Sequence, residues 1–121
     1  MSYDLCFWKQ TPGLQADPRS TYLALIEGRP LDGIEPFPID DFLTRVEESF
    51  PEARRDRQNG NELLWLDADD ALIFEISWSR AHVLAMLRPL DESVANRLID
   101  VALSVDAPLY DPQVDERFAV L

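Results

Sequence analysis

The sequence predicts an α+β fold in which an antiparallel sheet of about four to five strands packs against three helices on one face. Three apolar runs follow one another closely between residues 63 and 87, the spacing of antiparallel strands joined by short turns. Three other segments place apolar residues on one side of a helix. Strands and helices do not alternate as a parallel sheet requires. The expected order is β-α-α-β-β-β-α-β, in one domain over residues 1–121.

The first strand is expected from Tyr3 to Trp8, where β-forming residues alternate before the break at Thr11-Pro12-Gly13. The first helix is expected to begin with Asp17 as N-cap and Pro18 at its first position. Gly28 is a suitable stop for that helix.

Residues 29–38 contain three prolines and a glycine, which predicts irregular structure. The second helix follows and ends before Pro51, and residues 52–61 predict an exposed loop. The apolar stripe of this helix consists of Ile39, Phe42, Leu43, Val46 and Phe50.

The sheet continues with strands at residues 63–66, 71–78 and 82–87, with a tight turn at Asp69-Asp70. In the middle strand, the alternation of apolar and polar residues predicts one covered face and one wetter face that carries Glu75. Asp91 is the expected N-cap of the third helix, and the C-terminal segment after Pro108 is expected to form one short edge strand. The stripe of the third helix consists of Val94, Leu98, Val101 and Val105, with Ala95 and Ala102 beside it.

Charge is the main functional clue in the composition. The chain has 23 acidic and 11 basic residues, a formal net charge of −12, which disfavours nucleic acid and anionic membranes as partners. Cys6 is the single cysteine, so no internal disulfide can form. The N-terminal residues lack the basic and apolar regions of a signal peptide, so we expect a cytoplasmic protein. We also expect it to be monomeric when free.

Catalytic and metal-binding patterns are weak. Cys6 and His82 lie inside predicted strands, where a single cysteine is usually an inert apolar residue. The Asp67–Asp70 segment resembles the start of a calcium loop, but Leu72 occupies the position that requires glycine, so a hairpin turn is preferred. The glycines are too scattered for a phosphate cradle, and the Arg54-Arg55-x-Arg57 island is flanked by glutamates. No catalytic residue, metal or cofactor is therefore expected.

Three segments together carry a resemblance to a known class of protein. They are the opening Met-Ser-Tyr-Asp-Leu-x-Phe-Trp, the loop Leu31-Asp32-Gly33-Ile34 and the segment Tyr110-Asp111-Pro112-Gln113. The chain thereby resembles small bacterial immunity proteins of polymorphic-toxin and contact-dependent-inhibition systems. The resemblance implies a protein that binds and neutralises a cognate toxin, and it transfers no binding residue.

An acidic inhibitor fits a toxin with a basic active cleft, because carboxylates can occupy the places of substrate phosphates. Residues 62–121 hold twelve acids and four bases, against eleven and seven in residues 1–61, which favours the second half as the binding region. The expected toxin-binding residues are Asp67, Asp69, Asp70, Glu75, Asp91, Glu92, Asp40, Asp41 and Trp65.

Two alternatives remain open. The first is a small acidic cytosolic enzyme or ligand-binding domain that works through carboxylates in a deep pocket. The second is an oligomerising or scaffold domain in which Trp8, Trp65 or Trp78 forms an apolar patch for self-association.

Overall fold

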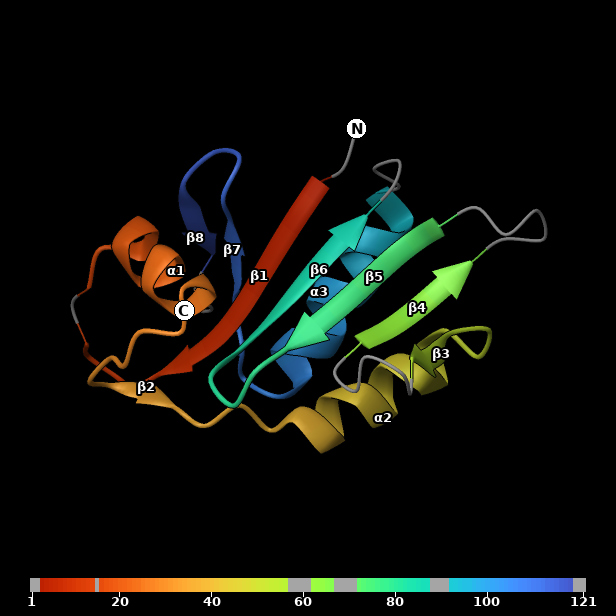
Figure 1. The fold of residues 1–121 in the computed structure, drawn as a ribbon, viewed down its shortest axis with the longest axis horizontal. Coiled ribbons are helices and arrows are strands. Elements are labelled where there is room, and N and C mark those ends of the chain that lie inside the picture. Colours follow the sequence, from red (N-terminus) through yellow and green to blue (C-terminus); the bar gives the residue numbers. More distant parts are fainter. Residues whose placement is uncertain (1–2, 15, 57–61, 67–71, 88–91, 119–121) are drawn as a thin grey trace.

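Strand β1 (Tyr3–Gln10) lies inside an antiparallel sheet, between β6 (His82–Leu87) and β7 (Leu109–Asp111) (Figure 1). The computed structural model describes residues 3–14, 16–56, 62–66, 72–87 and 92–118. Within these ranges the strand order is β3-β4-β5-β6-β1-β7-β8, and β2 pairs with the end of β1. The predicted α+β class and element order are confirmed.

The remaining elements follow the predicted order, with additional short strands. The helices are α1 (Pro18–Ile26), α2 (Ile39–Ser49) and α3 (Glu92–Ser104). The other strands are β2 (Ile34–Glu35), β3 (Arg54–Asp56), β4 (Glu62–Leu66), β5 (Leu72–Trp78) and β8 (Glu116–Phe118).

The main core lies between the sheet and the two helices α2 and α3. Alternation along the strands directs Leu5 and Phe7 of β1 and Phe74 and Ile76 of β5 into this layer, where all four are buried. The stripes predicted for α2 and α3 meet them, because each helix buries the face that repeats every three or four residues. The helix residues in this core are Phe42, Leu43, Val46, Val94, Ala95, Leu98, Val101 and Ala102.

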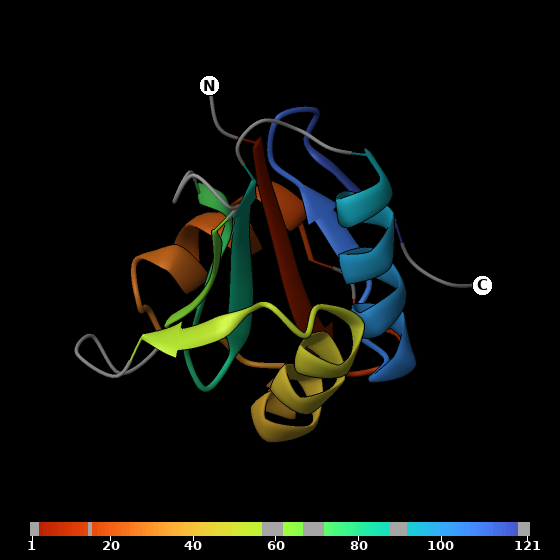
Figure 2. The same cartoon turned by 90° about the vertical axis from the view of Figure 1, so that its right-hand side faces the viewer.

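Helix α1 lies on the opposite face of the sheet, so the prediction that all helices share one face is wrong (Figure 2). Cys6 and Trp8 of β1 point to this second face, since they alternate with Leu5 and Phe7. Together with Leu25 of α1 and Tyr110 of β7 they form a second, smaller buried cluster. Buried aromatic and apolar side chains on both faces of β1 therefore require cover on both sides.

Local sequence signals set the ends of α1 as predicted. Asp17 is the N-cap, and its carboxylate accepts hydrogen bonds from the backbone N–H and the hydroxyl of Ser20 at 3.0 and 2.7 Å. Gly28 follows the helix with φ of +71°, the left-handed conformation that glycine adopts readily.

Two sequence predictions about short strands were wrong. Residues 54–56 form β3 instead of a loop, because backbone pairing with β4 at an edge requires no apolar side chains. The C-terminal segment forms a hairpin of β7 and β8 instead of one edge strand, and β7 lies inside the sheet. The positive φ of Asp115, 53°, lies in the turn that makes this hairpin possible.

The Tyr-Asp-Pro-Gln segment connects this hairpin to β1 through a side-chain clasp, defined here by Tyr3, Asp4, Asp111 and Gln113. The Gln113 amide accepts a hydrogen bond from the Asp4 N–H at 3.0 Å and donates one to the Asp4 carbonyl at 2.9 Å. The buried Asp111 carboxylate accepts hydrogen bonds from the Tyr3 hydroxyl and from the Gln113 amide. This segment therefore has a structural role in joining the two ends of the fold.

Candidate functional site

The predicted toxin-binding residues lie on both sides of the sheet. Asp40 and Asp41 occupy the first turn of α2, and Glu92 the first turn of α3, all of them exposed. Glu75 is half-buried on β5, on the face opposite to those helices. The sheet therefore separates Glu75 from the other three acids. Asp67, Asp69, Asp70, Asp91 and the side chain of Trp65 lie outside the described part of the structure.

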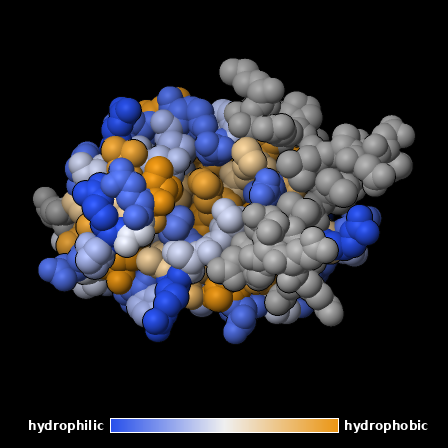
Figure 3. Space-filling model, in the orientation of Figure 1, coloured by the Kyte–Doolittle hydropathy of each residue, from blue (hydrophilic) through white to orange (hydrophobic). Residues whose placement is uncertain are grey.

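The part of the second face beside α1 is the first candidate site. We name it the open sheet face, because no helix of the described structure lies over β5 and β6 there (Figure 1). It is defined by Asp4, Glu75, Ser77, Leu84 and Met86, all half-buried. Helices α2 and α3 cover the other face of these strands (Figure 2). Figure 3 shows apolar side chains at the centre of this view, over β1 and β6 and beside α1.

Register places two carboxylate-bearing residues on either side of a methionine on this face. Met86 of β6 pairs with Asp4 of β1 and with Glu75 of β5, so the three residues form one row across the sheet. Leu84 lies in the next row, opposite Cys6 and Ser77. Partial burial raises the pKa of the Asp4 carboxyl above its ordinary value, because desolvation disfavours the charged form.

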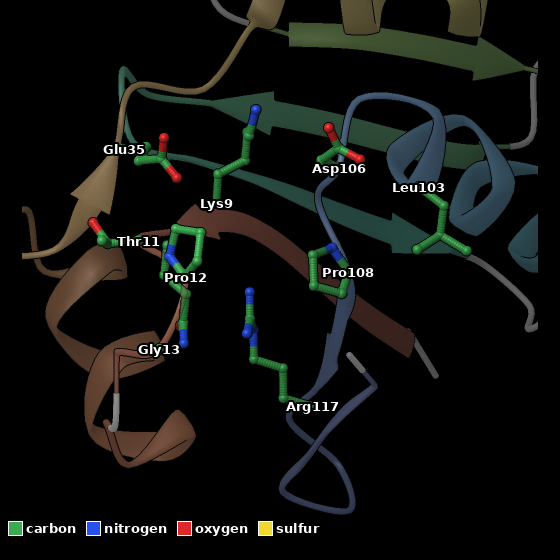
Figure 4. A pocket seen from close by; sticks show the side chains of 10 residues that line it. Lys9, Thr11, Pro12, Gly13, Glu35, Leu103, Asp106, Pro108 and Arg117 are labelled. Carbon is green, nitrogen blue, oxygen red and sulfur yellow. The ribbon is translucent and has the colours of Figure 1, made fainter. Parts of the chain in front are cut away.

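A pocket of about 770 Å³ at the end of β1 is the second candidate site (Figure 4). The turn after β1 forms one wall, the end of α3 another, and β8 contributes an arginine. Four of the lining side chains are ionisable, two cations and two carboxylates, which makes the pocket formally neutral in a protein of net charge −12. The lining residues are Lys9, Gln10, Thr11, Pro12, Gly13, Glu35, Leu103, Asp106, Pro108 and Arg117.

Arg117 is held at the pocket by Trp8. One terminal nitrogen donates a hydrogen bond to the Trp8 carbonyl at 3.3 Å, and the guanidinium carbon lies 5.1 Å from the centre of the Trp8 ring. The Nε–H is buried and has no hydrogen-bond partner within the described structure. Desolvation lowers the pKa of Arg117 from its ordinary value. The cation is therefore fixed in position with part of its hydrogen-bonding capacity unused.

Asp106 reaches the pocket from the turn that ends α3. The Ala107 N–H bonds to the Ala102 carbonyl at 2.9 Å and the Asp106 N–H to the Leu103 carbonyl at 3.0 Å, the two bonds of a Schellman motif. Asp106 holds the left-handed position of this motif with φ of 60°, where glycine is the usual residue. A carboxylate is thus present at a backbone position that disfavours its side chain.

Cys6 and His82 do not form a nucleophilic pair. Cys6 is buried, and desolvation raises the pKa of its thiol far above the usual range. The His82 ring Nδ1 lies 2.7 Å from the Ser79 hydroxyl, and burial lowers the pKa of the imidazole. Among the described residues no group of three or more His, Cys, Asp or Glu side chains is arranged to hold a metal ion.

The sequence did not predict the pocket at the end of β1. Its charged residues Lys9, Glu35, Asp106 and Arg117 are distributed over almost the whole chain and follow no motif. The one local signal was aspartate directly after a helical stripe, where the C-terminal glycine of a helix is normally expected.

The fold and these two sites define an α+β protein with an open sheet face and a separate charged pocket. The chain matches no protein-family model, and comparisons with curated proteins and with solved structures gave no match. In the described part of the chain, none of the helices has the length and apolar character needed to cross a membrane.

Proposed function

We propose that this protein is a cytoplasmic immunity protein, which binds a cationic bacterial toxin through the open sheet face and neutralises it. The row Asp4–Met86–Glu75 is the observation that carries the proposal, because it combines an apolar contact with two acidic positions in register. The net charge of −12 supports it further, since an acidic protein attracts a basic partner over a long range.

Protein interfaces combine an apolar centre with a polar and charged rim. Apolar and flexible side chains such as Leu84 and Met86 supply contact area at the centre, while charged residues at the rim guide association and select the partner. The partly desolvated Asp4 carboxylate would gain a favourable interaction from a lysine or arginine of the partner. The protein would then cover the basic cleft that such a toxin uses to hold its substrate.

The test is binding to the toxin encoded by the adjacent gene, measured by titration calorimetry at several salt concentrations. We expect tight binding that weakens with salt, because the charges at the interface are screened. The double variant Asp4→Asn/Glu75→Gln should weaken binding at least about tenfold.

The matched control is Asp40→Asn/Asp41→Asn, which removes the same charge from the exposed first turn of α2, away from the open sheet face. Its binding should stay close to that of the unmodified protein. Equal losses in both double variants would show that net charge alone acts, and no complex with the toxin would refute the proposal.

The alternative is a small ligand-binding protein or enzyme that uses carboxylates. The pocket that contains Glu35 and Asp106 favours the ligand-binding form of this alternative. The self-association hypothesis loses Trp8, which is fully buried, while Trp78 is half-buried and packs against the main core.

A further inference from the structure

We propose that the pocket between β1, β2, the end of α3 and β8 binds a small zwitterion of dipeptide size, with its carboxylate on Arg117 and its ammonium group beside Asp106 and Glu35. This inference does not depend on the proposed inhibitor role, since the pocket and the open sheet face share no residue.

Arg117 is the residue that we expect to bind the carboxylate of the ligand. Its planar guanidinium is the group that best matches a carboxylate, through two parallel hydrogen bonds. The arginine forms no ion pair with any residue that the structure describes, and its hydrogen bond to the Trp8 carbonyl fixes its orientation. Figure 4 shows the guanidinium directed into the space between Gly13 and Pro108. A ligand carboxylate there would supply the counter-charge.

The opposite side of the pocket is where we expect the ammonium group of the ligand to bind. Figure 4 shows Lys9 extending toward the space between Glu35 and Asp106, so this side carries two carboxylates and one cation. A second cation, supplied by the ligand, would balance the charges. The C-terminal end of α3 lies here as well, and its carbonyl groups favour positive charge. The left-handed backbone of Asp106 adds support, because unfavourable conformations of this kind gather at binding sites.

Size and charge favour a zwitterion over simpler ligands. A volume of about 770 Å³ lies within the range of small-molecule pockets and exceeds what a single small ion fills. A phosphate ion would gain from Arg117, but the side with Glu35, Asp106 and Lys9 has a net negative charge that would repel it. A molecule with one charge of each sign at its ends satisfies both sides together.

Three probes built on glycylglycine test the two ends separately. Glycylglycine carries both charges, N-acetylglycylglycine only the carboxylate, and glycylglycinamide only the ammonium group. Each is titrated into the full chain near neutral pH at constant ionic strength, and the amide signals of Thr11, Gly13 and Asp106 are followed by NMR. We expect saturable shifts with glycylglycine, and an affinity at least about tenfold lower for each of the blocked probes.

Variants then assign the contacts. Arg117→Met should lower the affinity for glycylglycine at least about tenfold. Arg97→Met is the matched control, because Arg97 also stacks on an aromatic ring, 4.0 Å from the centre of Phe50, outside this pocket. If Arg117→Met does not fold, Arg117→Lys keeps the charge and loses the paired hydrogen bonds, and it should also bind more weakly.

Asp106→Gly separates a binding role from a structural one. Glycine suits the left-handed position, so the melting temperature should rise. Binding of glycylglycine should weaken at the same time, while binding of N-acetylglycylglycine stays unchanged. The proposal is overturned if glycylglycine gives no saturable shift, if the three probes bind equally, or if Arg97→Met weakens binding as much as Arg117→Met.

Discussion

Single residues with unusual backbone or protonation properties account for several local features of this protein. Gly13 in the turn after β1 and Gly33 in the turn before β2 both adopt positive φ, 82° and 80°. The Thr11 N–H bonds to the Gly33 carbonyl at 2.8 Å, so the two turns hold each other in place. Their surroundings differ, because a Cβ at Gly33 would lie 2.8 Å from a methyl carbon of Leu14, whereas one at Gly13 would meet no atom within 4 Å.

This difference predicts unequal effects of alanine at the two glycines. Each substitution places a side chain in the left-handed region, which costs about 1 kcal/mol of stability. Gly33→Ala also displaces Leu14, so it should be more destabilising than Gly13→Ala. Chemical denaturation of both variants measures the two losses. Equal values would mean that Leu14 moves aside without cost.

His82 predicts a pH dependence of stability. Burial lowers its pKa below the ordinary value, so the folded protein resists protonation while the unfolded chain binds a proton near pH 6.5. This contribution is complete above about pH 6.5 and is lost as the pH falls toward the pKa of the folded state. His82 is the single histidine, so its NMR titration is unambiguous.

The control for this prediction is His82→Gln, which removes the titrating group. The difference in unfolding free energy between the two proteins should change below about pH 6.5 and remain constant above it. A midpoint for His82 above 6.5 in the folded protein would contradict the prediction.

At the scale of elements, the apolar pattern of the sequence predicted the long helices and central strands but missed β3 and the C-terminal hairpin. Apolar periodicity identified α2, α3 and the strands β4 to β6, because each buries a continuous stripe or alternates in the sheet. It could not identify β3, where the side chain of Arg54 is exposed. It also could not identify the hairpin, whose turn depends on the positive φ of Asp115. The clasp was equally invisible, since Gln113 and Asp4 are 109 residues apart.

The clasp predicts that the hairpin depends on Gln113. Gln113→Ala removes both hydrogen bonds to the Asp4 backbone and one donor to the buried Asp111, so it should destabilise the protein by about 1–3 kcal/mol. Val114→Ala is the control in the same turn, because this exposed side chain should contribute less than about 0.5 kcal/mol. Thermal unfolding compares them, and similar melting temperatures for the two variants would show that the clasp is dispensable.

For the whole molecule, the sequence was sufficient for the fold class and insufficient for the sites. The net charge indicated an acidic surface, but it could not show that the sheet separates Glu75 from Asp40 and Asp41. The pocket depends on Lys9, Glu35, Asp106 and Arg117 coming together from four different elements or their ends. Such placements follow from tertiary packing, which local patterns do not encode.

The position of β1 also has a consequence for synthesis of the chain. Its main partners, β6 and β7, come much later in the chain than β1 itself, and the short strand β2 pairs only with its end. A strand with apolar side chains on both faces therefore lacks most of its hydrogen-bonding partners until β6 and β7 have been synthesised. Exposed strands of this kind invite aggregation, so the nascent chain should depend on molecular chaperones until β6 and β7 emerge.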